Sequence, residues 1–195
     1  EENRLKGVGD GQYKEGGNRL SLTRTNVEAI KQFIEARQSG QRVKLIGVAE
    51  MLSMTRGLER LIDGKPSGVF ALFPNYKALK DHAQTSEGRD LGVIVKAVEK
   101  HGIKHLITEL NQASQTPPPA DKALTISTVH KAKGQEFDRV QVAGDWPVDE
   151  FGEAKELDDE EKRLMYVATT RARASVDLSR VVPWLKTMSA SHEPA

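Results

Sequence analysis

Residues 20–28 read LSLTRTNVE and predict a short strand that runs directly into a capped helix. Thr25 and Glu28 form a capping box, whose side chains can satisfy the first free amides of a helix. The helix is expected to run to about Gln38, and a second strand follows at 42–47. One helical face is apolar, with Val27, Ile30, Phe33 and Ile34. This strand-helix-strand order predicts an α/β domain with a parallel sheet.

The composition indicates one compact domain. A chain of 195 residues with 37% hydrophobic content can bury a single core. Because the net charge is only +1, a nucleic-acid surface must come from a local arrangement of Lys and Arg. The absence of cysteine excludes disulfides and Cys-based zinc sites, and no apolar run approaches the roughly 20 residues of a membrane span. We therefore expect a cytoplasmic protein without membrane contact.

The chain divides into a short leading segment and one domain. Residues 1–18 are polar and glycine-rich, which predicts a linker or the start of a domain cut from a longer protein. The domain is expected at 19–195, with a helical segment at about 49–115 and a stiff proline-rich connector at 116–121. Three more strands are predicted, at 123–128, 139–143 and 175–179.

Residues 125–137 read TISTVHKAKGQEF and gather hydrogen-bond donors after a predicted strand. Open parallel sheets bind their ligands at the carboxyl ends of the strands, so this string predicts a binding site there. Taken singly, His130, Lys131 and Lys133 also fit ordinary solvated loop residues.

A second informative string is a predicted helix at 160–170 that runs into an arginine. Leu164, Val167 and Ala168 define its apolar stripe, and at 3.6 residues per turn Arg171 falls on that stripe. A guanidinium there needs an anion. An ion pair with a nearby carboxylate is the commoner structural explanation, and a bound ligand is the alternative.

Together the two strings resemble motifs V and VI of the UvrD/Rep-type superfamily 1 helicases, enzymes that couple ATP hydrolysis to movement along single-stranded DNA. The resemblance implies the second RecA-like motor domain, called 2A. Its expected fold is α/β, a RecA-like parallel sheet flanked by helices, with a helical insert between motifs IV and V. It also implies that Thr128 and His130 face the DNA while Gly134 and Glu136 face the nucleotide, with Glu136 accepting hydrogen bonds from the ribose hydroxyls.

The same resemblance gives two arginines a catalytic role. Arg171 matches the arginine that reaches across an inter-domain cleft to the γ-phosphate of ATP and neutralises charge during phosphoryl transfer. The tripeptide at 24–26, RTN, resembles motif IV, which supplies a second arginine to that phosphate. Arg24 also fits a solvated turn residue. Arg173 points to another face and is expected to be scaffold or DNA-side charge.

No G-x-x-x-x-G-K-[ST] loop occurs in the sequence, so this chain cannot cradle the phosphates of ATP and a magnesium ion by itself. The resemblance therefore implies part of an ATP-dependent DNA helicase, inactive alone, whose ATP and Mg²⁺ are bound mainly by an N-terminal motor domain of the same protein. The interval between motifs IV and V is too short for the full 2B subdomain of UvrD, Rep and PcrA. A non-catalytic nucleic-acid or protein-binding module derived from this fold is the alternative.

Two remaining features have simple explanations. Trp146, Phe151 and Tyr76 could stack bases, but no interleaving of basic and aromatic residues supports that role, and packing is expected. The acidic run at 149–161 lacks the spacing of a metal-binding loop. We expect a solvated segment and no metal site.

Overall fold

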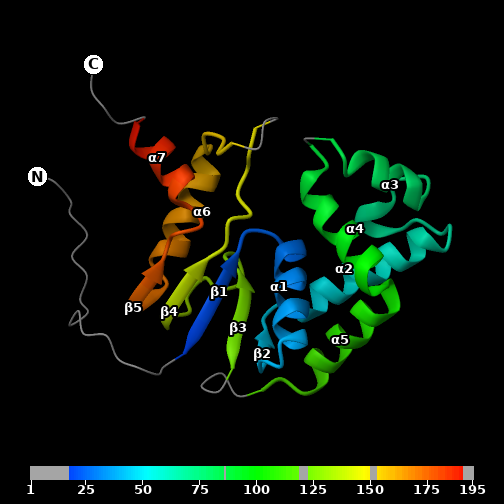
Figure 1. Ribbon diagram of the computed structural model, residues 1–195, viewed down its shortest axis with the longest axis horizontal. Coiled ribbons are helices and arrows are strands. Elements are labelled where there is room, and N and C mark those ends of the chain that lie inside the picture. The colour runs from blue at the N-terminus through cyan, green and yellow to red at the C-terminus, as the bar shows by residue number, and fades with distance from the viewer. Residues whose placement is uncertain (1–17, 86, 119–122, 150–152, 191–195) are drawn as a thin grey trace, which may run out of the picture.

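A computed structural model describes residues 18–85, 87–118, 123–149 and 153–190, and within them the chain forms a five-stranded sheet in the order β2-β3-β1-β4-β5 (Figure 1). Every neighbouring pair of strands is parallel. The strands are β1 at Arg19–Thr23, β2 at Val43–Leu45, β3 at Leu124–Thr128, β4 at Phe137–Val142 and β5 at Ala172–Asp177. The predicted α/β class with a RecA-like parallel sheet is confirmed.

Helix α1, Asn26–Gln38, starts where the sequence predicts, but only half of the capping box forms. The Thr25 hydroxyl accepts the Glu28 amide at 3.1 Å. The Glu28 carboxylate instead accepts from Lys31 and Gln32. In a complete capping box the Glu28 carboxylate would accept the Thr25 amide, but this amide donates to the Asp145 carboxylate at 2.8 Å.

The helices cover both faces of the sheet. Helix α1 lies on one face, where Ser21 of β1 donates to Gln32 at 2.6 Å. Leu20 and Leu22, on either side of Ser21, point to the opposite face. There they share a core cluster with residues of α6, Asp159–Thr169, and of the C-terminal helix α7, Val182–Ala190. Because strand side chains alternate between faces, β1 contributes to two separate cores.

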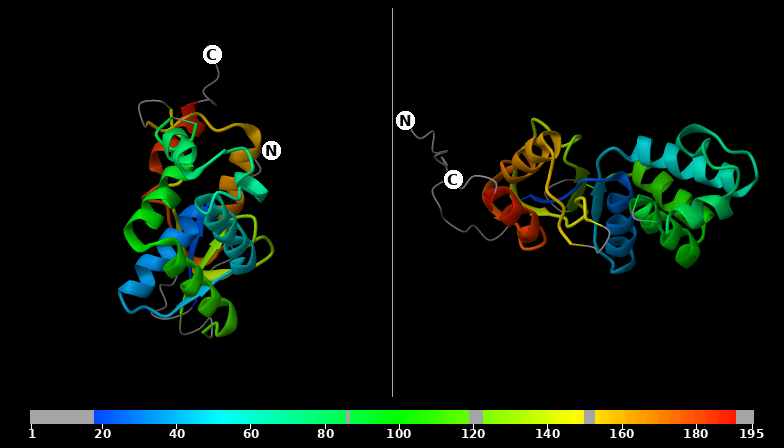
Figure 2. Two further views of the ribbon diagram at one scale, coloured as in Figure 1. Left: turned by 90° about the vertical axis from the view of Figure 1, so that its right-hand side faces the viewer. Right: turned by 90° about the horizontal axis from the view of Figure 1, so that it is seen from above.

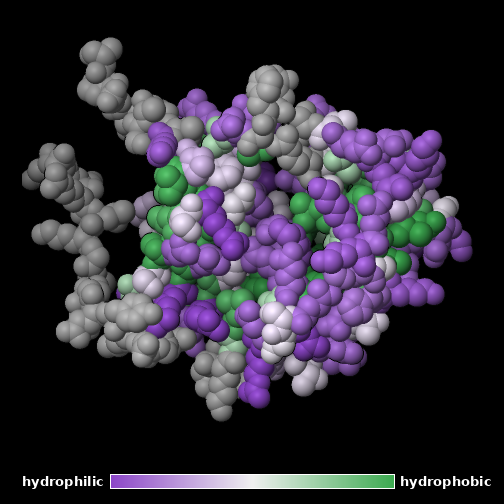
Figure 3. Space-filling view, in the orientation of Figure 1, coloured by the Kyte–Doolittle hydropathy of each residue, from purple (hydrophilic) through white to green (hydrophobic). Residues whose placement is uncertain are grey.

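A helical insert between β2 and β3 packs against the outer side of α1 (Figure 1, Figure 2). It shares one hydrophobic core with α1 and β2. On the face shown in Figure 3 its surface is mostly hydrophilic. The predicted insert between motifs IV and V is thus confirmed. Its elements are α2 at Val48–Ile62, the 3-10 helix η1 at Gly68–Phe70, α3 at Tyr76–His82, α4 at Arg89–His101 and α5 at Ile103–Gln115.

Two elements differ from the expectations. Strand β5 begins at Ala172, earlier than the predicted 175, and most of its residues are exposed because it forms one edge of the sheet. An exposed edge strand carries no apolar alternation that would mark its start. Helix α7, anchored by buried Trp184, was not predicted.

None of the helices in the described part of the chain has the length and apolar character needed to cross a bilayer. The leading segment predicted at 1–18 lies outside the described residues except for its last position.

Candidate nucleotide and DNA site

The segment between β3 and β4 is a tight turn that the sheet holds in place. Val129 extends the β3 ladder, because its amide donates to the Thr23 carbonyl at 2.9 Å. The Thr128 carbonyl then accepts two amides, those of Lys131 and Ala132, each at 3.1 Å. Val129 and Ala132 are completely buried. They anchor the turn on the core, and its polar side chains stay exposed.

The turn carries the chain from one edge of the sheet to the other. Strands β3 and β4 are both parallel to β1, so the chain must return from the carboxyl edge to the amino edge between them. Thr128 and His130 lie at the carboxyl edge, where β3 ends. Glu136 lies at the amino edge, directly before β4, and Gly134 precedes it on the way. The expectation that the whole string would gather at the carboxyl edge is therefore wrong for its second half.

Glu136 and Arg171 stand next to each other at the amino edge. The amide of Phe137 donates to the Arg171 carbonyl at 3.0 Å, and the strand register pairs Phe137 with Ala172. The Glu136 side chain is exposed. Gly134 adopts a φ of 78°, the left-handed conformation that favours glycine, and an added Cβ would meet no atom within 4 Å. The backbone conformation, and not crowding, requires glycine at this position.

The Arg171 guanidinium folds back onto the C-terminal end of α6. Its Nε donates to the Val167 carbonyl and its Nη2 to the Thr170 hydroxyl, both at 3.1 Å. The negative end of the helix dipole favours a cation at this place. No carboxylate of the described residues forms an ion pair with Arg171, so the simple structural explanation for its burial is not met. Its charge is left for another anion.

Arg24 lies at the carboxyl edge of the sheet, immediately after β1, whereas Arg171 lies at the amino edge. Its Nε donates to Glu161 Oε1 at 2.8 Å and its Nη1 to Asp90 Oδ2 at 3.1 Å. Burial lowers the pKa of Arg24, but the two carboxylates outweigh it and leave the pKa raised. By the strand register, Arg24 is level with residue 144 and Arg171 with residue 136, a separation of roughly 25 Å at about 3.3 Å per residue. In this arrangement the two guanidinium groups cannot contact one phosphate.

A partly buried carboxylate fixes the backbone beside Arg24. Asp145 follows β4, and its two oxygens accept the Arg24 amide at 2.9 Å, the Thr25 amide at 2.8 Å and the Thr25 hydroxyl at 2.9 Å. An anion therefore already occupies the N-terminal end of α1. Burial raises the pKa of the Asp145 carboxyl, and these hydrogen bonds offset part of the rise.

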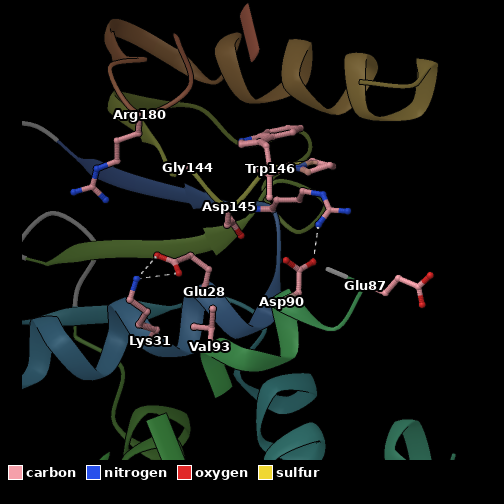
Figure 4. A pocket seen from close by; sticks show the side chains of 12 residues that line it. Glu28, Lys31, Glu87, Asp90, Val93, Gly144, Asp145, Trp146 and Arg180 are labelled. Atoms are coloured by element: carbon pink, nitrogen blue, oxygen red, sulfur yellow. Dashed lines mark hydrogen bonds and ion pairs between the residues drawn. The ribbon is translucent and has the colours of Figure 1, made fainter. Parts of the chain in front are cut away.

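A cavity of about 690 Å³ opens beside Arg24 (Figure 4). It lies at the carboxyl edge between β1, which connects through α1 to β2, and β4, which connects through α6 to β5 in the other direction. Such a divergence point is a common ligand position in α/β sheets. Its walls carry both signs of charge, and several of these charges are paired with one another, as in the Arg24–Asp90 and Lys31–Glu28 ion pairs.

Three of the other candidate residues have structural partners. Trp146 is 3% exposed and donates to the Ala143 carbonyl at 3.1 Å, which supports packing. Arg173 forms an ion pair with Asp138 at 3.2 Å, in keeping with a scaffold role. Lys131 pairs with Glu50 at the start of α2, so the turn is also tied to the helical insert. Tyr76 is half-buried, Lys133 is exposed, and Phe151 lies outside the described residues.

The acidic run is less solvated than expected. Leu157 is 2% exposed and packs in the core, and the Glu161 side chain is 16% exposed because it pairs with Arg24. Among the described residues, no group of three or more His, Asp or Glu could hold a metal ion.

The parallel sheet, the turn that crosses it and the arginine at the end of α6 define the class of a RecA-like motor domain. The family model of the UvrD-like helicase C-terminal domain matches residues 23–181. The chain belongs to this family, and it is therefore a helicase motor domain.

Curated relatives agree with this assignment. F-box DNA helicase 1 of Gallus gallus is 32% identical over 130 residues, which cover 58% of this chain and 12% of that protein. ATP-dependent DNA helicase UvrD1 of Mycobacterium tuberculosis H37Rv is 34% identical over 98 residues, 48% of this chain and 12% of the relative. UvrD1 of Mycobacterium leprae is 33% identical over 117 residues, which cover 55% of this chain and 14% of the relative. The chain thus spans only a small part of the length of the relatives it matches. No solved structure matches it significantly.

Sequence reasoning missed three carboxylates at the carboxyl edge: Asp145, Asp90 and Glu161. Asp145 had a usable signal, because it follows directly after a predicted strand, where ligand-facing and capping residues of α/β sheets gather. Asp90 and Glu161 are far from Arg24 in sequence, and nothing in their local pattern distinguishes them from solvated acidic residues.

Proposed function

We propose that this chain is the C-terminal motor domain of an ATP-dependent DNA helicase or translocase. It would complete an ATP site whose phosphate-binding loop belongs to an N-terminal motor domain of the same protein, and form part of a single-stranded DNA track. Family membership supports the helicase part of the proposal. Gly134 and Glu136 face the nucleotide, Arg171 contacts the γ-phosphate, and His130 and Thr128 belong to the DNA side.

One observation carries this proposal: the turn at 129–136 has His130 at one edge of the sheet and Glu136 beside Arg171 at the other. This short segment is held by its own hydrogen bonds and has one end on each side. A change of contacts at the nucleotide can therefore reach the DNA side through it, as coupling of ATP hydrolysis to DNA binding needs. His130 is exposed, whereas Thr128 is 5% exposed and supports the turn through its carbonyl. The proposed DNA contact therefore depends chiefly on His130.

The proposal leaves Arg24 outside the nucleotide group, because its guanidinium is paired with two carboxylates at the other edge of the sheet. The direct contact with the γ-phosphate that the motif resemblance implies stays a prediction. No magnesium ligand is assigned to this chain, since the described residues offer no suitable cluster. Magnesium, when bound, would neutralise phosphate charge during transfer.

Substitution of His130 tests the coupling. In the intact protein, His130→Ala is expected to lower the DNA-stimulated ATPase by roughly 5- to 10-fold, the scale of one lost hydrogen bond, and to leave the DNA-free rate nearly unchanged. Both rates are measured over a range of single-stranded DNA concentrations. His105→Ala, an exposed histidine on α5, is the matched control. Equal loss of both rates in the His130 variant would assign His130 to the ATP site or the fold.

Substitution of Glu136 tests the nucleotide contact. Hydrogen bonds from ribose hydroxyls to a carboxylate are charge-assisted and contribute about 1.5–3 kcal/mol. Glu136→Gln is therefore expected to raise the KM for ATP by roughly tenfold or more with a smaller change in kcat. Glu160→Gln, on the exposed first turn of α6, is the control. A 2′,3′-dideoxyribose analogue, which lacks both donors, should show the same KM in the wild type and in Glu136→Gln, and a persisting tenfold difference would exclude the ribose contact.

A further inference from the structure

Arg24 joins three parts of the domain through its side chain and its backbone amide. Its Nε donates to Glu161 in the first turn of α6, and its Nη1 donates to Asp90 in the first turn of α4. Its own backbone is fixed at the end of β4, because the Arg24 amide donates to Asp145. The guanidinium is thus held on the sheet and contacts both the α6 helix and the helical insert.

The two ion pairs differ in exposure. The Glu161 side chain is 16% exposed and that of Asp90 is 60% exposed. The second oxygen of Glu161, Oε2, is buried and accepts no hydrogen bond from a described residue. Glu161 therefore depends on Arg24 for its charge partner within the described chain, whereas solvent can replace Arg24 at Asp90. Removal of one partner from an ion pair with little exposure costs far more stability than removal of one partner from an exposed pair.

Helix α6 connects this ion pair to the nucleotide side. It runs from Asp159 to Thr169 with the sequence DEEKRLMYVAT, which contains no glycine or proline to bend it. Glu161 lies in its first turn, and Arg171 follows its last turn and donates to the Val167 carbonyl. A helix of this length is a rigid rod of about 16 Å. A shift of its first turn is therefore carried to Arg171.

We propose that Arg24 is a positioning residue: through Glu161 it sets the place of α6 and hence of Arg171, and through Asp90 it connects that helix to the helical insert. The proposal rests on the proposed role of Arg171 at the γ-phosphate. It differs from direct contact of Arg24 with the nucleotide, since the guanidinium acts here from the far end of α6. Movement of the insert would first break the exposed Asp90 pair and leave the Glu161 pair intact.

A double-mutant cycle in the intact protein tests the pair. Arg24→Gln and Glu161→Gln are each expected to lower the DNA-stimulated kcat by roughly 10- to 100-fold, the scale of a misplacement of about 1 Å, with little change in the KM for ATP. The double variant should lose no more than either single variant, because each single change already breaks the Arg24–Glu161 pair. Arg37→Gln, which breaks the Arg37–Glu109 pair between α1 and α5, is the control: Glu109 is 17% exposed, close to the 16% of Glu161, and the variant should keep the wild-type kcat.

Exchange of the two charges separates positioning from nucleotide contact. In an Asp90→Asn background, which avoids a new repulsion, Arg24→Glu combined with Glu161→Arg should recover most of the kcat that either single change loses. A guanidinium that contacts phosphate directly cannot be restored from position 161. Losses that the exchange does not recover, losses that add in the double variant, or single variants within twofold of wild type would each overturn the proposal. The additivity test decides the matter even if the exchanged protein does not fold.

The outcome is distinguishable from failure of the proposed function. One possible result is that Arg171→Ala abolishes the wild-type ATPase while Arg24→Gln and Glu161→Gln keep a normal kcat. That result overturns only the positioning role of Arg24. An intact wild-type protein without DNA-stimulated ATPase overturns both. Thermal melting of each variant identifies losses that merely follow the folded fraction, and such losses would also contradict positioning.

Discussion

Replacement of Arg171 by alanine in the intact protein is expected to lower the DNA-stimulated kcat of ATP hydrolysis by roughly 10³-fold or more, the scale of an arginine finger. The guanidinium is held by the Val167 carbonyl and the Thr170 hydroxyl, and no described carboxylate neutralises it. Those two acceptors are uncharged, so the loss of the side chain leaves no buried anion behind. The fold should therefore survive, and the charge that develops at the γ-phosphate should lose its partner.

A nearby arginine provides the control for this variant. Arg173 lies two positions further along the chain and pairs with Asp138 at 3.2 Å, with an exposed side chain. Arg173→Ala should change kcat by only a few-fold, as expected for an exposed ion pair. Steady-state ATPase at saturating DNA and ATP, with circular dichroism of each variant, checks both results. A turnover of Arg171→Ala within a few-fold of wild type would assign Arg171 a purely structural role.

Replacement of Asp145 by alanine is expected to have the largest effect on stability, with a loss of about 2–3 kcal/mol in the free energy of unfolding. The carboxylate accepts two amides and the Thr25 hydroxyl at the junction of β1, α1 and β4. Alanine leaves these donors without an acceptor in a partly buried place. Asp63→Ala, at the exposed C-terminal end of α2, is the control and should change stability by less than about 0.5 kcal/mol. Urea denaturation measures both values, and equal effects would show that water replaces Asp145 freely.

The pH dependence of the same site has a definite sign. Burial raises the pKa of Asp145 above its usual value of 3.8, so the folded protein binds this proton more tightly than the unfolded chain does. The contribution of Asp145 to stability is then greatest below pH 3.8 and falls as the pH rises through the raised pKa. Relative to Asp145→Asn, which does not titrate, the wild type should lose stability over that interval. A difference that grows with pH would contradict the raised pKa.

The sequence predicts the elements whose signals are local. Thr25 marks the start of α1 because an N-cap bonds a residue three positions away. The placement of Arg171 on the apolar stripe of α6 follows from helical periodicity alone. The insert between β2 and β3 is equally visible from its helical apolar pattern. These features depend on residues within one or two turns of each other.

The parts that sequence reasoning missed depend on register and on distant contacts. The position of Glu136 at the amino edge follows from the alignment of β4 with β1, which no local pattern specifies. Arg24 meets Glu161 across 137 positions of sequence. The Asp145 bond to the Thr25 amide, across 120 positions, displaces half of a capping box that is correct by local rules. Tertiary contacts therefore decide where Arg24 and Glu136 lie.

The most direct test of the central claim, that this domain is one half of an ATP-driven motor, is a side-by-side ATPase measurement. The chain alone, shown to be folded by circular dichroism, is compared with the intact protein, each with and without single-stranded DNA. Because the sequence has no Walker A loop, we expect no turnover from the chain alone and DNA-stimulated hydrolysis by the intact protein. DNA-stimulated turnover by the chain alone, in a preparation free of other ATPases, would contradict it.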